Sequence, residues 1–174
     1  MKCYLNDMAD DYLKMILRAP VYDVAKVTPL EVAPNISRRL KNRVFLKRED
    51  MQPVFSYKIR GAYNLMSSLS RKEREKGVIA ASAGNHAQGV ALAADKLHCR
   101  SAVVMPKTTP NIKVDAVKAL GAEVILYGNS YDEAETHAKG LSSKRGMIFI
   151  PPYDHPLVIA GQGTVAMEIM RQHS

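Results

Sequence analysis

Short apolar runs and stretches of helical periodicity alternate through the second half of this sequence. Four runs rich in β-branched and small apolar residues occur, at residues 78–81, 102–105, 123–127 and 147–150. Their starts lie roughly 20 to 25 residues apart, which is the spacing of successive strand and helix units in a parallel sheet. The pattern therefore predicts an open, parallel, four-stranded α/β domain with helices in the connections.

Apolar residues at helical spacing occupy each of the three connections between these runs. The stripes consist of Ala87, Val90, Ala91 and Ala94, then of Ile112, Ala116, Val117 and Leu120, and finally of Ala134, Ala138 and Leu141. A repeat of this kind places one apolar face of a helix against the sheet. Gly121 and Gly146 follow the second and third stripes, where a left-handed residue commonly ends a helix.

The flanking sequence has a different character. Residues 10–17 form an amphipathic helical pattern that must end near Ala19, because Pro20 disfavours helix in the residue before it. Residues 28–30 and 44–47 have extended character without a partner nearby, residues 151–156 form a rigid proline-containing loop, and residues 158–170 form a further helix. We interpret these elements as the incomplete edge of a second α/β domain. The predicted division is 1–51 for the leading part of a large domain, 52–155 for the small α/β domain, and 156–174 for a helix returning to the large domain.

Composition narrows the class of protein. With 174 residues, 47% of them hydrophobic, the chain can bury the core of one domain, or of one domain and part of another. No apolar run approaches the roughly 20 residues that span a bilayer, and the N-terminus lacks the apolar core of a signal peptide, so we expect a soluble cytoplasmic protein. Cys3 and Cys99 lack metal-binding spacing, and we expect two reduced thiols and no metal site.

The net charge of +8 raises nucleic-acid binding as an alternative. Basic clusters occur at residues 38–43 and 71–76, but neither contains interleaved aromatic residues, and glutamates interrupt the second as on a solvated helix. We therefore expect neither a nucleic-acid partner nor a membrane partner.

A lysine opens one of the apolar helices. Apolar residues recur at helical spacing from Ile59 onward, so a helix should begin close to Lys58, with Ser56 as a possible N-cap. The positive end of the helix dipole and the nearby Arg60 both disfavour the ammonium form of Lys58. An amine nucleophile needs such a shift, because an ordinary lysine is protonated at neutral pH. On spacing alone, an exposed surface lysine remains the alternative.

A polar turn, Ser82-Ala83-Gly84-Asn85-His86, joins the first predicted strand to the helix that follows it. Backbone amides at such a helix N-terminus bind anions, and Gly84 permits a close approach of the ligand. The turn matches neither the glycine spacing of the dinucleotide fingerprint nor the lysine position of a P-loop. An ordinary capped turn with a structural histidine is the alternative, but a lysine combined with an anion site indicates carbonyl chemistry.

Both motifs resemble those of the pyridoxal-phosphate enzymes of fold type II, the tryptophan-synthase β-like family. The first, Ser56-Tyr57-Lys58-Ile59-Arg60-Gly61-Ala62, is similar to the threonine/serine dehydratase branch, and most similar to the biosynthetic threonine ammonia-lyases. The resemblance extends from about residue 20 to residue 171. Further matching segments lie at residues 46–50, 104–106, 113–116, 151–156 and 161–164.

This resemblance implies pyridoxal 5'-phosphate as the cofactor and an amino acid as the substrate. Lys58 would bind the cofactor as a Schiff base and remove the α-proton, Asn85 would hydrogen-bond the cofactor's 3-hydroxyl group, and Tyr57 would pack near its ring. The substrate carboxylate would be held by Ser82, Gly84, Asn85 and His86. The implied reaction is the conversion of L-threonine to 2-oxobutanoate and ammonia in isoleucine biosynthesis, by an enzyme that is a homo-oligomer when intact.

The sequence departs from the family pattern at its far end. Family members carry a run of glycines for the cofactor phosphate just beyond the point where this sequence stops, and a regulatory domain later. We therefore expect a fragment with feeble activity toward threonine. A serine dehydratase or racemase of the same family remains an alternative, as does a non-catalytic remnant that associates with an intact homologue.

Overall fold

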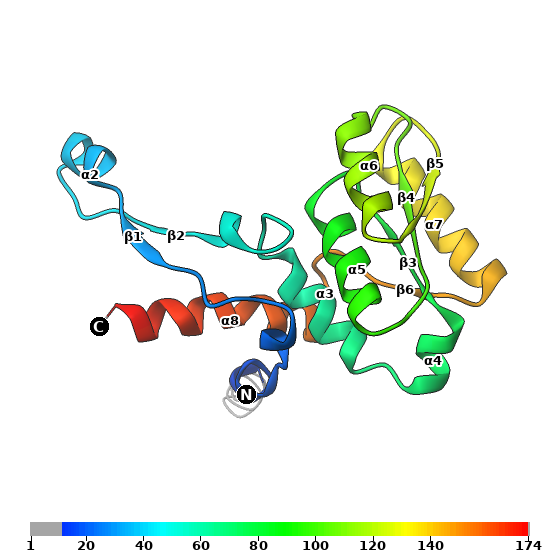
Figure 1. Cartoon of the computed structure of the whole chain (residues 1–174), viewed down its shortest axis with the longest axis horizontal. Helices are drawn as coiled ribbons and strands as arrows, with labels where there is room; N and C mark the ends of the chain where they lie inside the picture. The colour runs from blue at the N-terminus through cyan, green and yellow to red at the C-terminus, as the bar shows by residue number, and fades with distance from the viewer. Residues whose placement is uncertain (1–11, 174) are drawn as a thin grey trace, which may run out of the picture.

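A computed structural model describes residues 12–173 (Figure 1). Residues 12–18 are helical, which agrees with the predicted helix, although its first two predicted residues lie outside the described range. The remaining elements, in chain order, are η1 (Val21–Asp23), β1 (Leu30–Val32), α2 (Pro34–Leu40), β2 (Phe45–Lys47), η2 (Glu49–Met51), α3 (Lys58–Ser67), α4 (Arg71–Lys76), β3 (Val78–Ala81), α5 (Asn85–Lys96), β4 (Ser101–Met105), α6 (Asn111–Ala119), β5 (Glu123–Leu126), α7 (Tyr131–Arg145), β6 (Ile148–Phe149) and α8 (Pro156–Gln172).

The four predicted strands form one parallel sheet in the order β5-β4-β3-β6. β3 and β4 are buried along their whole length, as expected for central strands covered on both faces. β6 pairs with β3 through only two residues, Ile148 and Phe149, before two prolines end the strand. The prediction of an open parallel α/β domain is confirmed.

Helices cover both faces of this sheet. α5 and α6 pack on one face through a cluster that includes Ala91, Val103 and Val117, and α7 packs on the other through Ala134 and Ala138. α7 begins where the Ser130 hydroxyl accepts the amide hydrogen of Glu133, and it ends at Gly146 in a left-handed conformation. The three predicted helical connections are therefore confirmed.

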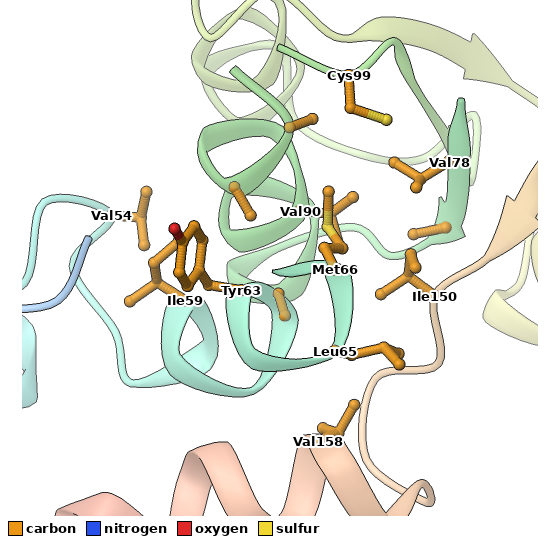
Figure 2. Close-up of a cluster of buried hydrophobic side chains, with 14 of the residues drawn as sticks. Val54, Ile59, Tyr63, Leu65, Met66, Val78, Val90, Cys99, Ile150 and Val158 are labelled. Carbon is orange, nitrogen blue, oxygen red and sulfur yellow. The ribbon is translucent and has the colours of Figure 1, made fainter. Parts of the chain in front are cut away.

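α3 packs against α5. Its apolar face, which includes Ile59 and Met66, packs with Val90 of α5 and Ile150 after β6 (Figure 2). A Cβ atom at Gly89 would lie 3.2 Å from the Lys58 carbonyl group, so glycine at this position allows α5 to approach the first residue of α3 closely. Cys99 is a free thiol at the edge of the same core.

An arm built from the flanking segments extends away from the sheet, with the β1–β2 hairpin and α2 on one side and α8 on the other (Figure 1). β1 and β2 pair antiparallel, with Leu30 opposite Lys47 and Val32 opposite Phe45. The expectation that these segments lack a partner is wrong, because they pair with each other across the excursion that contains α2. The predicted division into residues 1–51, 52–155 and 156–174 stays a prediction.

α8 is anchored to α3 by a close helix crossing. A Cβ atom at Gly161 would lie 2.5 Å from the Arg60 carbonyl oxygen and 2.7 Å from the Gly61 Cα atom. Because no larger residue fits without moving backbone, glycines at this crossing bring the two helices into direct backbone contact. α8 begins at Pro156, two residues before the predicted start, and His155 caps it through Nδ1, which accepts the amide hydrogen of Leu157.

Candidate functional site

Lys58 is the first residue of α3, as the sequence predicts. The N-cap position is occupied by Tyr57, in helical conformation and without a side-chain cap. The expectation that Ser56 caps the helix is wrong, because its hydroxyl is buried and has no hydrogen-bond partner. The helix start is fixed instead by packing of the residues that follow, of which Ile59 is fully buried.

The Lys58 side chain is partly buried and reaches toward the loop that follows β6. Its Nζ atom donates to the carbonyl oxygen of Pro152 at 2.9 Å and lies 5.5 Å from the centre of the Tyr57 ring. Burial lowers the pKa of the Lys58 ammonium below its ordinary value. A larger neutral fraction at a given pH is what an amine nucleophile requires.

Arg60 does not contribute to this shift in the way expected from the sequence. Its guanidinium turns to the opposite side of α3, where it is fully buried and forms ion pairs with Glu49 and Glu168. Residues separated by two positions lie on opposite faces of a helix. The predicted effect of Arg60 on Lys58 is therefore wrong, and desolvation alone accounts for the lowered pKa.

The polar turn connects β3 to α5 at the carboxyl end of the sheet. Gly84 occupies the N-cap position of α5, and its amide donates to the Ser82 hydroxyl at 3.2 Å. Asn85 is exposed at the first helical position. A Cβ atom at Gly84 would meet nothing within 4 Å, so the space above this glycine is open. The helix N-terminus presents amide groups that favour a bound anion.

His86 is buried immediately beneath this turn, with 4% of its surface exposed. Its Nε2 atom lies 3.0 Å from the carbonyl oxygen of Ile150. Because a carbonyl oxygen only accepts, Nε2 carries the hydrogen and Nδ1 is the bare nitrogen of a neutral ring. Nδ1 has no partner. Burial, together with the nearby charge of Lys58, lowers the pKa of His86 to about 4, although the contact with Ile150 opposes this shift.

The fold thus brings the predicted residues together at one place. Lys58 contacts the loop after β6 through Pro152, His86 contacts the same loop through Ile150, and β6 is the sheet neighbour of β3, which leads into the turn. Sequence reasoning missed the two carbonyl groups of Ile150 and Pro152. The only available signal was the position of the rigid loop after the fourth predicted strand.

The family model described as pyridoxal-phosphate dependent enzyme matches residues 21–174. This chain belongs to that family. The predicted cofactor, pyridoxal 5'-phosphate, is confirmed, because the enzymes of this family depend on it.

Individual relatives are consistent with this membership. The tomato protein (Solanum lycopersicum) named threonine dehydratase 2 biosynthetic, chloroplastic, is 60% identical over 167 residues, which cover 96% of this chain and 28% of the relative. The Saccharomyces cerevisiae threonine dehydratase, mitochondrial, is 54% identical over 167 residues, which cover 96% of this chain and 29% of the relative. The solved structure of the processed form of tomato threonine deaminase isoform 2 superposes with a TM-score of 0.91 at 60% identity, covering 95% of this chain and 48% of that one.

The names of these relatives bear on the predicted cellular location, and their lengths bear on how much of such a protein this chain represents. Because they are named chloroplastic or mitochondrial, the prediction of a cytoplasmic protein is contradicted. No helix within residues 12–173 is long and apolar enough to cross a membrane. The chain spans less than a third of the length of the curated relatives it matches.

The residues at this site fit the cofactor of the pyridoxal-phosphate-dependent enzymes. Lys58 supplies an amine with a lowered pKa, Asn85 an exposed amide, and the N-terminus of α5 a set of amide donors above which Gly84 leaves open space. A hollow of about 590 Å³ beside α7, lined by Tyr127 and His137 among others, contains none of the predicted site residues. The donor set around Lys58, and not this hollow, therefore marks the candidate site.

Proposed function

We propose that this chain carries the catalytic lysine and the substrate-carboxylate turn of a threonine ammonia-lyase that converts L-threonine to 2-oxobutanoate and ammonia, a step of isoleucine biosynthesis. The observation that carries the proposal is the partly buried Lys58 amine at the start of α3, which contacts the same loop after β6 as His86 of the turn before α5. The names of the tomato and yeast relatives support threonine as the substrate.

In this proposal Lys58 has two tasks. Its neutral amine holds the cofactor, and after substrate binds the same amine takes the proton from the substrate's α-carbon. Burial supports both tasks, because it raises the fraction of unprotonated amine. Pyridoxal phosphate, when bound, supplies an electron sink for the negative charge that develops at the α-carbon.

The turn before α5 would orient the substrate. The carboxylate would lie at the α5 N-terminus, where amide donors and the helix dipole favour negative charge. The residues assigned to this role are Ser82, Gly84, Asn85 and His86. Asn85, which is exposed at the first helical position, would also donate to the cofactor's 3-hydroxyl group, and Tyr57, which is 43% exposed, would pack beside the cofactor ring.

Reductive trapping tests the role of Lys58. The 174-residue protein is incubated with pyridoxal phosphate, reduced with borohydride, digested and mapped by mass spectrometry. We expect the label on Lys58, and we expect it to persist in a Lys113→Arg control and disappear in Lys58→Arg. A label confined to Lys47 or Lys113 would overturn the assignment.

The substrate is tested with the same label. An amino acid that binds at the site displaces Lys58 from the cofactor and so protects Lys58 from reduction. L-Threonine should protect at lower concentration than L-serine, and 2-oxobutanoate should form. Preferential protection by L-serine would favour the serine dehydratase or racemase alternative, and no protection by either would favour a non-catalytic remnant. Assembly into a homo-oligomer, which light scattering would detect, stays a prediction.

A further inference from the structure

Two carbonyl groups on one short segment contact the side chains of Lys58 and His86. The Ile150 carbonyl oxygen faces Nε2 of His86 at 3.0 Å, and the Pro152 carbonyl oxygen accepts from Nζ of Lys58 at 2.9 Å. Only Pro151 separates the two carbonyl-bearing residues. The position of one carbonyl therefore constrains the position of the other.

This segment is stiff because of its residue types. Pro151 and Pro152 have backbone φ angles fixed by their rings and no amide hydrogens that could be satisfied in another arrangement. Ile150 is held on three sides: its side chain is fully buried, its amide donates to Ile79 of β3 at 2.8 Å, and its carbonyl contacts His86. Beyond the prolines the constraint ends, since Tyr153 is 64% exposed.

We propose that His86 is a positioning residue for Lys58, which it holds in place through the rigid segment Ile150-Pro151-Pro152. The proposal rests on the proposed function, in which Lys58 is the catalytic lysine. The hydrogen on His86 Nε2 fixes the position of the Ile150 carbonyl. Because Pro151 and Pro152 are stiff, the position of the Pro152 carbonyl is then fixed as well. The Pro152 carbonyl in turn sets the direction of the Lys58 amine.

The arrangement suits a lysine that alternates between amine and ammonium. The Pro152 carbonyl accepts a hydrogen from Nζ in either state, so the amine keeps one direction before and after it takes a proton. A neutral His86 is required, because an imidazolium would repel the Lys58 ammonium. Burial of His86 maintains that neutral form, since its pKa of about 4 lies far below physiological pH.

Two substitutions at His86 separate the effect of its hydrogen-bond donor from the effect of filling the buried site. His86→Gln retains an amide hydrogen at the place of Nε2–H, and His86→Leu removes the donor while keeping an apolar side chain in the buried site. Pro151→Gly is the third variant, because it leaves both carbonyl groups and His86 in place but removes the stiffness between them. Urea unfolding monitored by circular dichroism establishes that each variant folds.

The readout is the reactivity of the Lys58 amine without cofactor. Proteins are methylated with trace formaldehyde and cyanoborohydride between pH 6 and pH 10, and peptide mass spectrometry compares Lys58 with Lys72, an exposed lysine on α4. In the unaltered protein Lys58 should become reactive at lower pH than Lys72. Loss of the constraint releases Lys58 into water, so its curve should move toward that of Lys72.

We expect roughly a three- to tenfold fall in the reactivity of Lys58 relative to Lys72 at pH 8 in His86→Leu, because each unit of pKa changes the amine fraction about tenfold. Pro151→Gly should give a change of the same direction, and His86→Gln should keep the curve of the unaltered protein. Unchanged curves in folded His86→Leu or Pro151→Gly would overturn the proposal. Failure of the proposed function is distinguishable, since it would appear as the absence of borohydride-trapped cofactor on Lys58 in the unaltered protein.

Discussion

Two cations separated by one residue on α3 have opposite environments. Lys58 is partly exposed, makes one hydrogen bond to a backbone carbonyl, and has no carboxylate within ion-pair distance among residues 12–173. Arg60 is fully buried, and its five N–H groups make five hydrogen bonds, to Glu49, Glu168, Thr164 and the Lys26 carbonyl. Their side chains leave the helix about 200° apart. A helix can therefore carry reactivity on one face and a rigid attachment on the other.

Pairing with carboxylates is the reason why the pKa values of the two groups shift in opposite directions. Burial disfavours charge on both, and for Lys58 nothing offsets it, so the pKa of its ammonium falls. For Arg60, hydrogen bonds and the charges of Glu49 and Glu168 outweigh burial, so the pKa of its guanidinium is raised further. On this helix the lysine with the lowered pKa has no carboxylate partner among the described residues, whereas the arginine with the raised pKa is fully paired.

The Arg60 cluster joins segments that are distant in the sequence. Glu168 of α8 accepts from Arg60, from Lys47 of β2 and from the Tyr22 hydroxyl, while Glu49 of η2 accepts from Arg60 and from the Thr28 hydroxyl. Two positive and two negative side chains balance within this cluster. It therefore fixes the arm to the helix that begins with Lys58.

Replacement of Arg60 should have the largest effect on the stability of the protein. Arg60→Met leaves the buried Glu49 without its ion-pair partner and leaves Glu168 with Lys47 alone, and we expect a loss of about 3 to 5 kcal/mol in the free energy of unfolding. Lys58→Met is the matched control on the other face, where we expect a change of about 0.5 kcal/mol or less. Urea denaturation measures both variants. Equal losses of unfolding free energy in the two variants would show that the Arg60 face of α3 contributes no more to stability than the Lys58 face.

Replacement of Glu168 tests the cluster through pH. Burial raises the pKa of Glu168, but hydrogen bonds from Arg60, Lys47 and Tyr22 and the charge of Arg60 outweigh it, so the pKa is lowered overall. A carboxyl with a lowered folded-state pKa stabilises the protein above its unfolded pKa of about 4.3, and this contribution is lost as pH falls through the folded value.

We therefore expect Glu168→Gln to cost about 1.5 to 3 kcal/mol at pH 7 and to weaken the loss of stability below about pH 4.3. Urea midpoints measured from pH 7 down to pH 3 provide the test. Glu75→Gln is the control, because the ion pair of Glu75 with Arg71 is exposed on α4 and is expected to contribute less than about 1 kcal/mol. An acid limb for Glu168→Gln as steep as that of the control would contradict the assignment.

The smallest effects concern the glycine crossing beneath Arg60. Gly161→Ala forces a methyl group against the Arg60 carbonyl and the Gly61 Cα atom, and we expect it to cost about 1 to 3 kcal/mol. Gly140→Ala is the matched control in α7, where a Cβ atom meets nothing within 4 Å. It should stabilise the protein by roughly 0.5 to 1 kcal/mol, because alanine favours a helix interior. Thermal unfolding of the two variants in parallel would show whether their effects have opposite sign.

Local patterns in the sequence predicted the sheet and its helices because each depends on neighbouring residues. The apolar runs gave β3, β4, β5 and β6, and the glycines at 121 and 146 marked helix ends. The position of Lys58 at the start of α3 and the turn before α5 also followed from periodicity and residue type. The family motifs, which the family match at residues 21–174 confirms, pointed to pyridoxal phosphate.

Other features depended on contacts that no local pattern encodes. The β1–β2 pairing joins two strands of three residues each across α2, so neither strand carries enough alternation to reveal its partner. The cellular compartment was predicted wrongly, because absence of a spanning or signal segment does not identify a destination. The roles of the site residues and the domain boundaries stay predictions.

The residues of α3 show which features the sequence determines and which depend on the folded structure. The sequence by itself determined that Lys58 and Arg60 would occupy the first turn of a helix, because helical periodicity is a property of the chain within one or two turns. Only the tertiary structure decided that Arg60 meets Glu49 and Glu168 while Lys58 meets the carbonyl of Pro152. Glu168 lies 108 residues from Arg60, and a backbone carbonyl has no side-chain identity to read, so both partners become apparent only when the chain has folded.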